Sequence, residues 1–106
     1  MLGADHPDTA TCLNKLAGLY HSQGRYFEAE PLYTDALSIH RRVLGADHPD
    51  TASSLNNLAG LYRAQGWVAE AATMLKEAVE IMVRVLGAEN PKTKIVREIY
   101  EGCWRR

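Results

Sequence analysis

The chain lacks several features that would assign it to a specialised class of protein. Its net charge is −1 over 106 residues, so it has no excess of basic residues for binding nucleic acid or an acidic membrane surface. No apolar run approaches the roughly 20 residues of a membrane span, and the N-terminus has no signal-peptide core. The two cysteines, Cys12 and Cys103, have no CxxC spacing. We therefore expect a cytoplasmic protein with free thiols, without nucleic-acid or membrane partners.

The sequence also lacks the motifs of common enzymes. It contains no GxxxxGK[ST], GxGxxG, HExxH or GxSxG segment, and its four serines have no recognisable base or elbow. His6 and His48 occur in separate linkers, so their side chains are not expected to converge within the 2.0–2.3 Å that zinc ligation requires. His21 and His40 have no paired acid or nucleophile in the sequence. We expect no enzyme activity, no cofactor and no metal site.

What the sequence does contain is a repeat. The stretch LGADHPDTA occurs at Leu2 and again at Leu44, and a weaker copy, LGAENPKT, begins at Leu86. Aligned at this interval of 42 residues, 2–43 and 44–85 are identical at 24 positions, 18 of them among the first 23. A fixed period of this size indicates stacked supersecondary units. We expect one domain, 1–106, made of unit one (2–43), unit two (44–85) and a partial third unit (86–106).

Within each unit the apolar spacing predicts two helices. The first helix has apolar residues at i, i+3, i+4 and i+7, which share one helix face. They are Leu13, Leu16, Ala17 and Tyr20, and again Leu55, Leu58, Ala59 and Tyr62. A second stripe follows with Ala29, Leu32, Tyr33, Ala36 and Leu37, and then Ala71, Met74, Leu75, Ala78 and Val79. Gly24 and Gly66 suit the end of a helix. Each unit is therefore predicted to be a helical hairpin.

The repeated LGADHPDTA is interpreted as a link between hairpins. Gly45 follows the expected end of one helix, and Pro49 suits the first position of the next because its missing N–H has no partner there. Asp8 and Asp50 would lie in first helical turns, where negative charge is favourable. In the third copy, Asn90 precedes Pro91 and is a good N-cap residue.

These residues resemble the tetratricopeptide repeat. The first helix carries Leu13, Leu16, Ala17 and Tyr20, and the second Ala29, Tyr33 and Ala36; unit two repeats this pattern, with Leu75 in place of the aromatic residue. The 42-residue period and LNNLAGLY (55–62) are similar to the kinesin-light-chain variety. The resemblance implies an all-α solenoid of two hairpins plus a closing helix. In the third unit Tyr100 and Trp104 occupy the places of Leu16 and Tyr20, and no partner helix follows.

In the family that the chain resembles, the concave face of the first helices binds peptide segments of partner proteins, often with acidic residues. A stripe with i, i+3, i+7, i+10 spacing lies opposite the apolar face of each first helix. Glycines recur in it, either for close approach of a peptide or for close helix packing. Glu98, on the expected closing helix, is acidic, so the face is not expected to be purely cationic. The candidate peptide-binding residues are Asn14, Lys15, Gly18, His21, Asn56, Asn57, Gly60, Arg63 and Arg105.

An alternative function is self-assembly through apolar solenoid ends. Where unit one has Arg25, His40 and Arg41, unit two has Trp67, Met82 and Val83. Part of this apolar surplus must receive the closing helix, and the remainder could mark contact with a second copy. The candidate self-association residues are Trp67, Met82, Val83 and Trp104.

Overall fold

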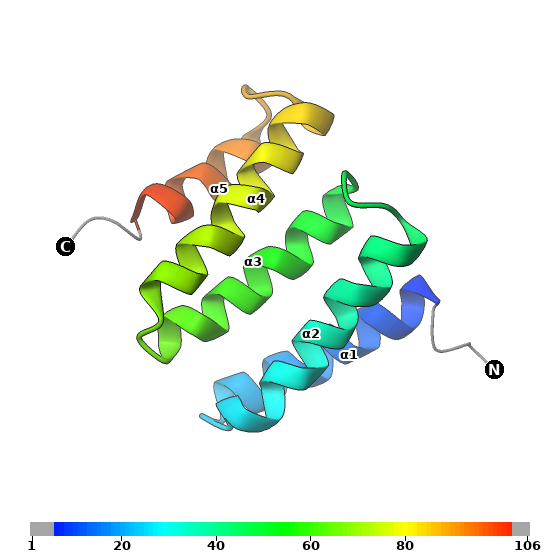
Figure 1. Cartoon of the computed structure of the whole chain (residues 1–106), viewed down its shortest axis with the longest axis vertical. Coiled ribbons are helices and arrows are strands. Elements are labelled where there is room, and N and C mark those ends of the chain that lie inside the picture. Colours follow the sequence, from blue (N-terminus) through cyan, green and yellow to red (C-terminus); the bar gives the residue numbers. More distant parts are fainter. Residues whose placement is uncertain (1–5, 103–106) are drawn as a thin grey trace.

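Five helices follow one another in the computed structural model, which describes residues 6–102. They are α1 (Pro7–Ser22), α2 (Tyr26–Val43), α3 (Pro49–Ala64), α4 (Val68–Leu86) and α5 (Pro91–Gly102), and this part of the chain contains no strand. Helices α1 and α2 form one antiparallel hairpin and α3 and α4 the next, while α5 packs on α4 (Figure 1). The all-α, two-hairpin architecture with a closing helix is confirmed.

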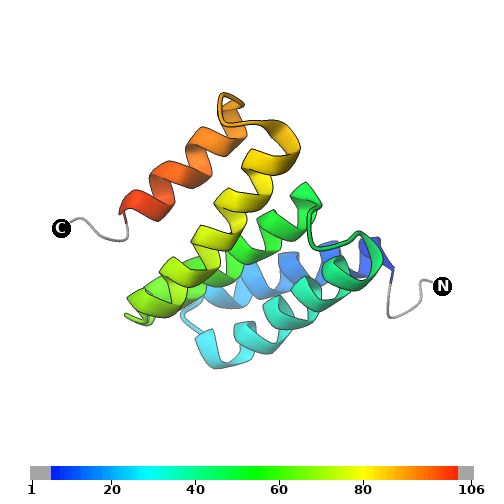
Figure 2. The same ribbon diagram turned by 45° about the horizontal axis from the view of Figure 1, so that its top comes forward.

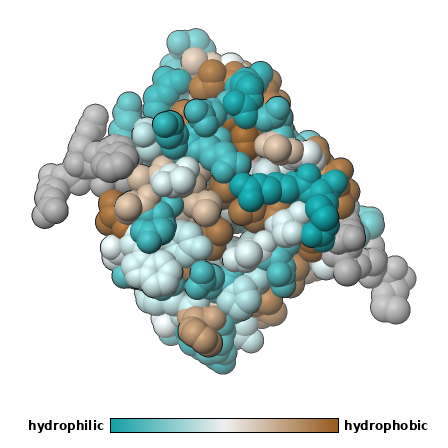
Figure 3. All heavy atoms as spheres, viewed as in Figure 1, coloured by the Kyte–Doolittle hydropathy of each residue, from teal (hydrophilic) through white to brown (hydrophobic). Residues whose placement is uncertain are grey.

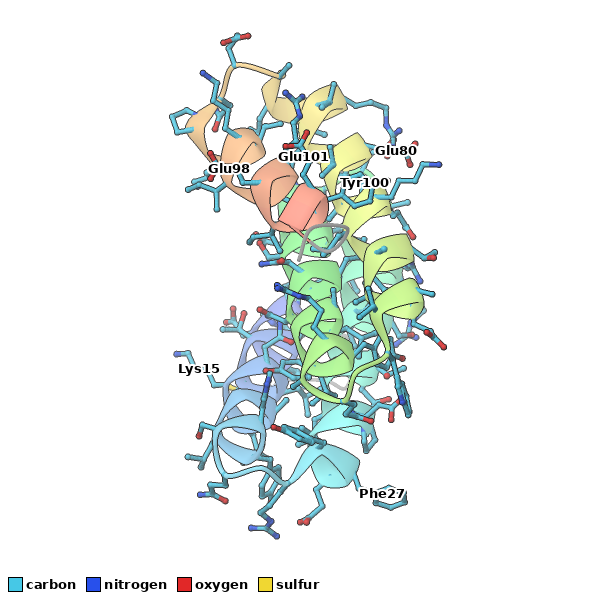
Figure 4. All side chains as sticks on the ribbon, turned by 90° about the vertical axis from the view of Figure 1, so that its left-hand side faces the viewer. Lys15, Phe27, Glu80, Glu98, Tyr100 and Glu101 are labelled. Carbon is cyan, nitrogen blue, oxygen red and sulfur yellow. The ribbon has the colours of Figure 1, made fainter. Side chains whose placement is uncertain are left out.

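The helices form two layers. The first helices of the units (α1, α3 and α5) lie on one side of the molecule, and the second helices (α2 and α4) on the other (Figure 4). Each helix contacts the next one along the chain, and α1 also touches α3. Figure 2 shows the resulting stack, with α1 and α2 at one end and α5 at the other. The described part of the chain thus has two end helices, α1 and α5.

The links between units are helix stops and starts, as predicted. Pro7, Pro49 and Pro91 begin α1, α3 and α5. The histidines before two of these prolines have a role that sequence reasoning missed. The Nδ1 atoms of His6 and His48 each accept a hydrogen bond from the backbone N–H two residues on, at 3.0 Å, so they cap the helix N-termini. Asn90 does the same for Lys92 at 2.9 Å in the third copy.

The tight turn inside each hairpin depends on a glycine. Gly24 and Gly66 have φ values of 76° and 82°, a left-handed conformation that other residues adopt at a cost. The residue after each glycine donates its backbone N–H to the carbonyl of a tyrosine five residues earlier, Arg25 to Tyr20 at 2.9 Å and Trp67 to Tyr62 at 2.8 Å. This is the Schellman arrangement, which satisfies the last carbonyls of a helix.

The core lies between the two layers. Its largest fully buried side chains include Leu55, Leu61, Leu75 and Ile81, and alanines on facing helices allow close approach. One predicted core residue is not in it. Leu16 is 41% exposed, whereas its equivalent in unit two, Leu58, is 2% exposed. The reason is position, because α1 is an end helix and no earlier hairpin of the described chain covers its outer face.

Candidate functional site

The candidate binding residues that the structure describes lie on α1 and α3. They belong to the exposed side of the layer formed by α1, α3 and α5, which we call the first-helix face. Viewed from the side, α3 is set back between α1 and α5, and Lys15 and Glu98 point outward on this side (Figure 4). Two hollows of about 340 and 300 Å³ follow one another here. The first lies between α1 and α3, and the second is bordered also by α5. Asn57 lines both hollows.

The structure groups most of the predicted residues in these hollows. Asn14 and Lys15 line the first, and His21, Asn56, Gly60 and Arg63 line the second, with Asn57 in both. The hollows also contain Thr11 and Ser53, which belong to the predicted stripes of the first helices but were not among the candidates. Four further lining residues were not predicted for this face, namely Tyr33, His40, Asp50 and Ile99. Arg105, predicted for this site, lies outside the described residues. Seven predicted residues therefore border two adjacent hollows on one face.

A hydrogen-bonded chain of three polar side chains underlies the first hollow. Asn14 Nδ2 donates to Ser54 Oγ at 3.4 Å, and Ser54 Oγ lies 2.6 Å from His40 Nδ1. Ser54 is fully buried and His40 is 4% exposed. With Asn14 as donor, Ser54 is free to donate its own proton to a neutral His40. Burial lowers the pKa of His40 below its ordinary 6.5, with Asp50 opposing the shift and His48 adding to it.

The same network leaves one acceptor without a partner. Asn14 Oδ1 is buried and has no hydrogen-bond partner among the described residues. A buried carbonyl oxygen without a partner is destabilising by roughly 1–3 kcal/mol. Asn14 lines the first hollow, and a ligand donor that reached this oxygen would satisfy it. A peptide N–H is such a donor.

The second hollow is more aromatic and cationic. His21 makes edge-to-face contacts with Tyr26 and Tyr33, with ring centroids 5.5 and 6.3 Å apart, so its ring is held in place. Arg63 lines the same hollow, and its guanidinium can bind a carboxylate in bidentate fashion. Burial raises the pKa of Tyr33, which keeps its hydroxyl protonated and available as a donor.

The glycines of the first-helix face are not required by helix packing. A Cβ atom built on Gly60 or Gly102 would meet nothing within 4 Å, and one on Gly18 would lie 3.6 Å from Tyr33 Oη, an ordinary contact. Close packing of neighbouring helices therefore gives no reason for these glycines. Gly60 borders the second hollow, where the missing side chain leaves room at the surface.

The candidate self-association residues are dispersed. Met82 is 4% exposed and packs in the core beside Val96, so it is not part of any exposed surface of the single chain. Trp67 and Val83 are partly exposed, and Trp67 packs on Tyr62 with ring centroids 5.5 Å apart. Trp104 lies outside the described residues. Figure 3 shows the face of α2 and α4, where hydrophobic patches are broken up by hydrophilic side chains.

The structure offers little for other chemistries. Within residues 6–102, no group of three His, Cys, Asp or Glu side chains is arranged to hold a metal ion. No helix of the same region is long and apolar enough to cross a membrane. Cys12 is a free thiol on the surface of α1.

Comparison with known proteins identifies related sequences and structures. A family model described as tetratricopeptide repeat matches residues 8–82. No curated protein matches the sequence significantly. Among solved structures, the TPR-like repeats of a protein from Podosopora anserina, described as a kinesin light chain with nearly identical repeats, superpose with a TM-score of 0.88 at 28% identity. That match covers 98% of this chain and 49% of the other.

A further solved structure is also similar. BtubC (BKLC) from P. vanneervenii superposes with a TM-score of 0.78 at 25% identity, over 95% of this chain and 46% of that one. This chain thus spans about half the length of each of these solved relatives.

Proposed function

Because this chain belongs to the tetratricopeptide repeat family, of the kinesin-light-chain-like kind, we propose that it is a non-enzymatic module that binds a peptide segment of a partner protein on its first-helix face. The tetratricopeptide repeat fold generally mediates protein–protein interaction. Location in the cytoplasm belongs to the same proposal, since the exposed thiol of Cys12 suits a reducing compartment.

The observation that carries the proposal is the pair of adjacent hollows lined by amide side chains. Asn14, Asn56 and Asn57 each offer both a donor and an acceptor, which matches the N–H and C=O groups of an extended peptide. Asn14 Oδ1 adds a buried acceptor without a partner in the described chain. A ligand N–H bound there would satisfy an oxygen that the fold leaves unsatisfied.

The charges around the hollows favour a ligand with acidic residues at defined places. Arg63 borders the second hollow and Lys15 the first, and of the two side chains Arg63 can bind a carboxylate in bidentate fashion. Asp50 in the first hollow and Glu98 on α5 limit this preference. The expected ligand is a mixed peptide with an acidic residue over Arg63, and not a uniformly acidic one.

The proposal is tested with peptides selected from a random library on the immobilised chain. Their affinities for Asn56→Ala and Arg63→Ala are measured by isothermal titration calorimetry. Loss of a charge-assisted or amide hydrogen bond should weaken binding about tenfold for each variant. Arg42→Ala, on the second-helix layer, is the matched control and should bind like the unmodified chain. If all three variants bind every selected peptide equally well, the assignment of this face is wrong.

A further inference from the structure

Another hollow, of about 580 Å³, lies between the turns of the two hairpins. It shares no lining residue with the two hollows of the first-helix face. Both turns are internal to the chain, so this hollow does not depend on where the sequence begins or ends. We call it the turn hollow. Its lining includes Arg25, Tyr26, Phe27, Glu30, Gln65 and Trp67.

Aromatic side chains from both units border the turn hollow. Phe27 is 92% exposed and projects away from the start of α2 (Figure 4). Trp67 is 44% exposed, and its ring packs on Tyr62. Tyr26 is held in place by its edge-to-face contact with His21. Aromatic rings attract cations to their faces, so this lining suits a group that is both flat or apolar and positively charged.

Glu30 adds a negative charge to the turn hollow. Its carboxylate oxygen Oε2 accepts a hydrogen bond from Tyr62 Oη at 3.3 Å, which joins the second unit to the first. Glu30 forms no ion pair with any residue that the structure describes. Burial raises the pKa of Tyr62, and the carboxylates of Glu30 and Glu70 raise it further. The surroundings of this hydroxyl are therefore negative.

The cation that lines the turn hollow, Arg25, is already engaged. Its Nε donates to Glu28 Oε1 at 3.0 Å, and its Nη2 also pairs with the Glu28 carboxylate. Its guanidinium carbon lies 4.6 Å from the centroid of the Tyr20 ring. Because Glu28 balances the charge of Arg25, the carboxylate of Glu30 leaves the turn hollow with an excess of negative charge.

Duplication of the repeat does not account for this lining. The glutamine and glycine of the turn are the same in both units, at 23–24 and 65–66. The residues that supply aromatic and acidic groups from unit one, Tyr26, Phe27 and Glu30, are different in unit two. Their equivalents 42 residues later are Val68, Ala69 and Ala72. The helical hairpin therefore forms without these groups, and the fold itself does not require them.

We propose that the turn hollow binds an arginine side chain of a partner protein. The guanidinium stacks on the exposed rings of Trp67 and Phe27 and donates hydrogen bonds to the Glu30 carboxylate. Arginine suits the hollow better than lysine, because its planar group can stack on a ring and bind one carboxylate through two N–H groups. This site is separate from the first-helix face, so it gives the chain a second contact with a partner.

The proposal is tested with four acetylated and amidated tripeptides, which have arginine, citrulline, lysine or leucine between two alanines. Each is titrated to millimolar concentration into the ¹⁵N-labelled chain, and chemical shifts are followed by NMR. The arginine peptide should shift the amide signals of both turns and the Trp67 indole N–H. Citrulline has the same shape as arginine but no charge, so its peptide should bind at least about fivefold more weakly. The lysine and leucine peptides should also bind more weakly.

Variants of the chain locate the site. Glu30→Gln can still accept from Tyr62 but lacks the charge, and should weaken binding of the arginine peptide about fivefold. Phe27→Ala removes a side chain that is already exposed, and should weaken binding about twofold. The matched control is Glu80→Gln, on α4 about 20 Å along the helix from Trp67, which should bind normally. Arg63→Ala should also bind normally, because Arg63 belongs to the first-helix face.

Several results would overturn the proposal. They are the absence of shifts with the arginine peptide, shifts confined to the first-helix face, equal binding of the citrulline peptide, and unchanged binding by Glu30→Gln. Equal binding of the lysine peptide would overturn the choice of arginine. Failure of peptide binding on the first-helix face would leave these results unaffected, because the two sites share no lining residue. The ¹⁵N spectra also show whether each variant is folded.

Discussion

Two junctions between successive units hold this molecule together, and they are built from different chemistry. Where α2 meets α3, buried His40 is hydrogen-bonded to Ser54, which in turn accepts from Asn14. Where α4 meets α5, the equivalent positions are occupied by Met82 and Val96, both buried and apolar. The backbone stacking is alike in both places. The comparison shows that one repeat geometry tolerates either a polar or an apolar contact at the same position.

The difference has a consequence for the first-helix face. At the polar junction the network extends from the core to Asn14, which lines the first hollow. Ligand binding at Asn14 should therefore alter the hydrogen bond between Ser54 and His40. At the apolar junction Val96 ends any such connection, because its side chain has no donor or acceptor. We expect the first hollow, and not the second, to be coupled to packing between units.

The largest effect is expected from removing the apolar contact. Met82→Ala leaves a cavity between α4 and α5, and should lower the free energy of unfolding by roughly 2–5 kcal/mol. Neighbouring Val83 is 38% exposed, and Val83→Ala should lower the free energy of unfolding by less than about 1 kcal/mol. Urea denaturation followed by circular dichroism measures both. Equal losses in the two variants would show that the second junction does not depend on Met82 packing.

A smaller effect is expected from converting the polar junction into the apolar one. The double variant His40→Met, Ser54→Val copies Met82 and Val96 into the first junction, and at neutral pH its stability should stay within about 1.5 kcal/mol. The stability of the double variant should depend on pH less than that of the unmodified chain does. In the unmodified chain the pKa of His40 is lowered by burial, so the unfolded chain binds this proton more readily. Stability is therefore full above about pH 6.5 and falls as pH drops from there toward the folded pKa.

Urea denaturation at several pH values below 6.5 separates the two proteins. The unmodified chain should lose up to about 1.4 kcal/mol per pH unit more than the double variant does. His6, His21 and His48 are present in both proteins, so their contributions cancel in the difference. Parallel stability curves in the two proteins would mean that burial of His40 has no energetic consequence.

The elements of the fold could be predicted well because units one and two show the same pattern of residues twice, so each unit checks the other. The 42-residue interval located five helices, the Pro residues that begin three of them and the two hairpin glycines, all of which depend on local spacing. Alignment of His40 with apolar Met82 could also have predicted that His40 is buried, because both positions lie where a second helix meets the first helix of the next unit.

Other features could not be predicted from the sequence. Leu16 and Leu58 have identical local sequences, yet one is exposed and the other buried, because exposure depends on what stacks next. The N-cap role of His6 and His48 was missed because histidine is not a common residue at that position. For the binding site, the spacing predicted which residues share a face, whereas the hollows and the Asn14 oxygen depend on three-dimensional packing.

The smallest effect concerns two glycines at equivalent positions in units one and two, Gly18 and Gly60. Both lie inside helices, where glycine is less favourable than alanine by about 0.5–1 kcal/mol. An added Cβ on Gly60 meets nothing within 4 Å, and one on Gly18 makes an ordinary contact with Tyr33. Gly18→Ala and Gly60→Ala should therefore each stabilise the chain by about 0.5–1 kcal/mol, a rise of a few degrees in melting temperature.

The two glycine variants should differ in binding. Gly60 borders the second hollow, so its new methyl group should weaken binding of a peptide selected on the unmodified chain, whereas Gly18 borders neither hollow. Thermal denaturation and titration calorimetry on the two variants provide the comparison. A Gly60→Ala variant that is less stable than the unmodified chain would point to a packing role for the glycine. One that is more stable but binds equally well would remove Gly60 from the binding site, because bare backbone at this position would then serve no ligand.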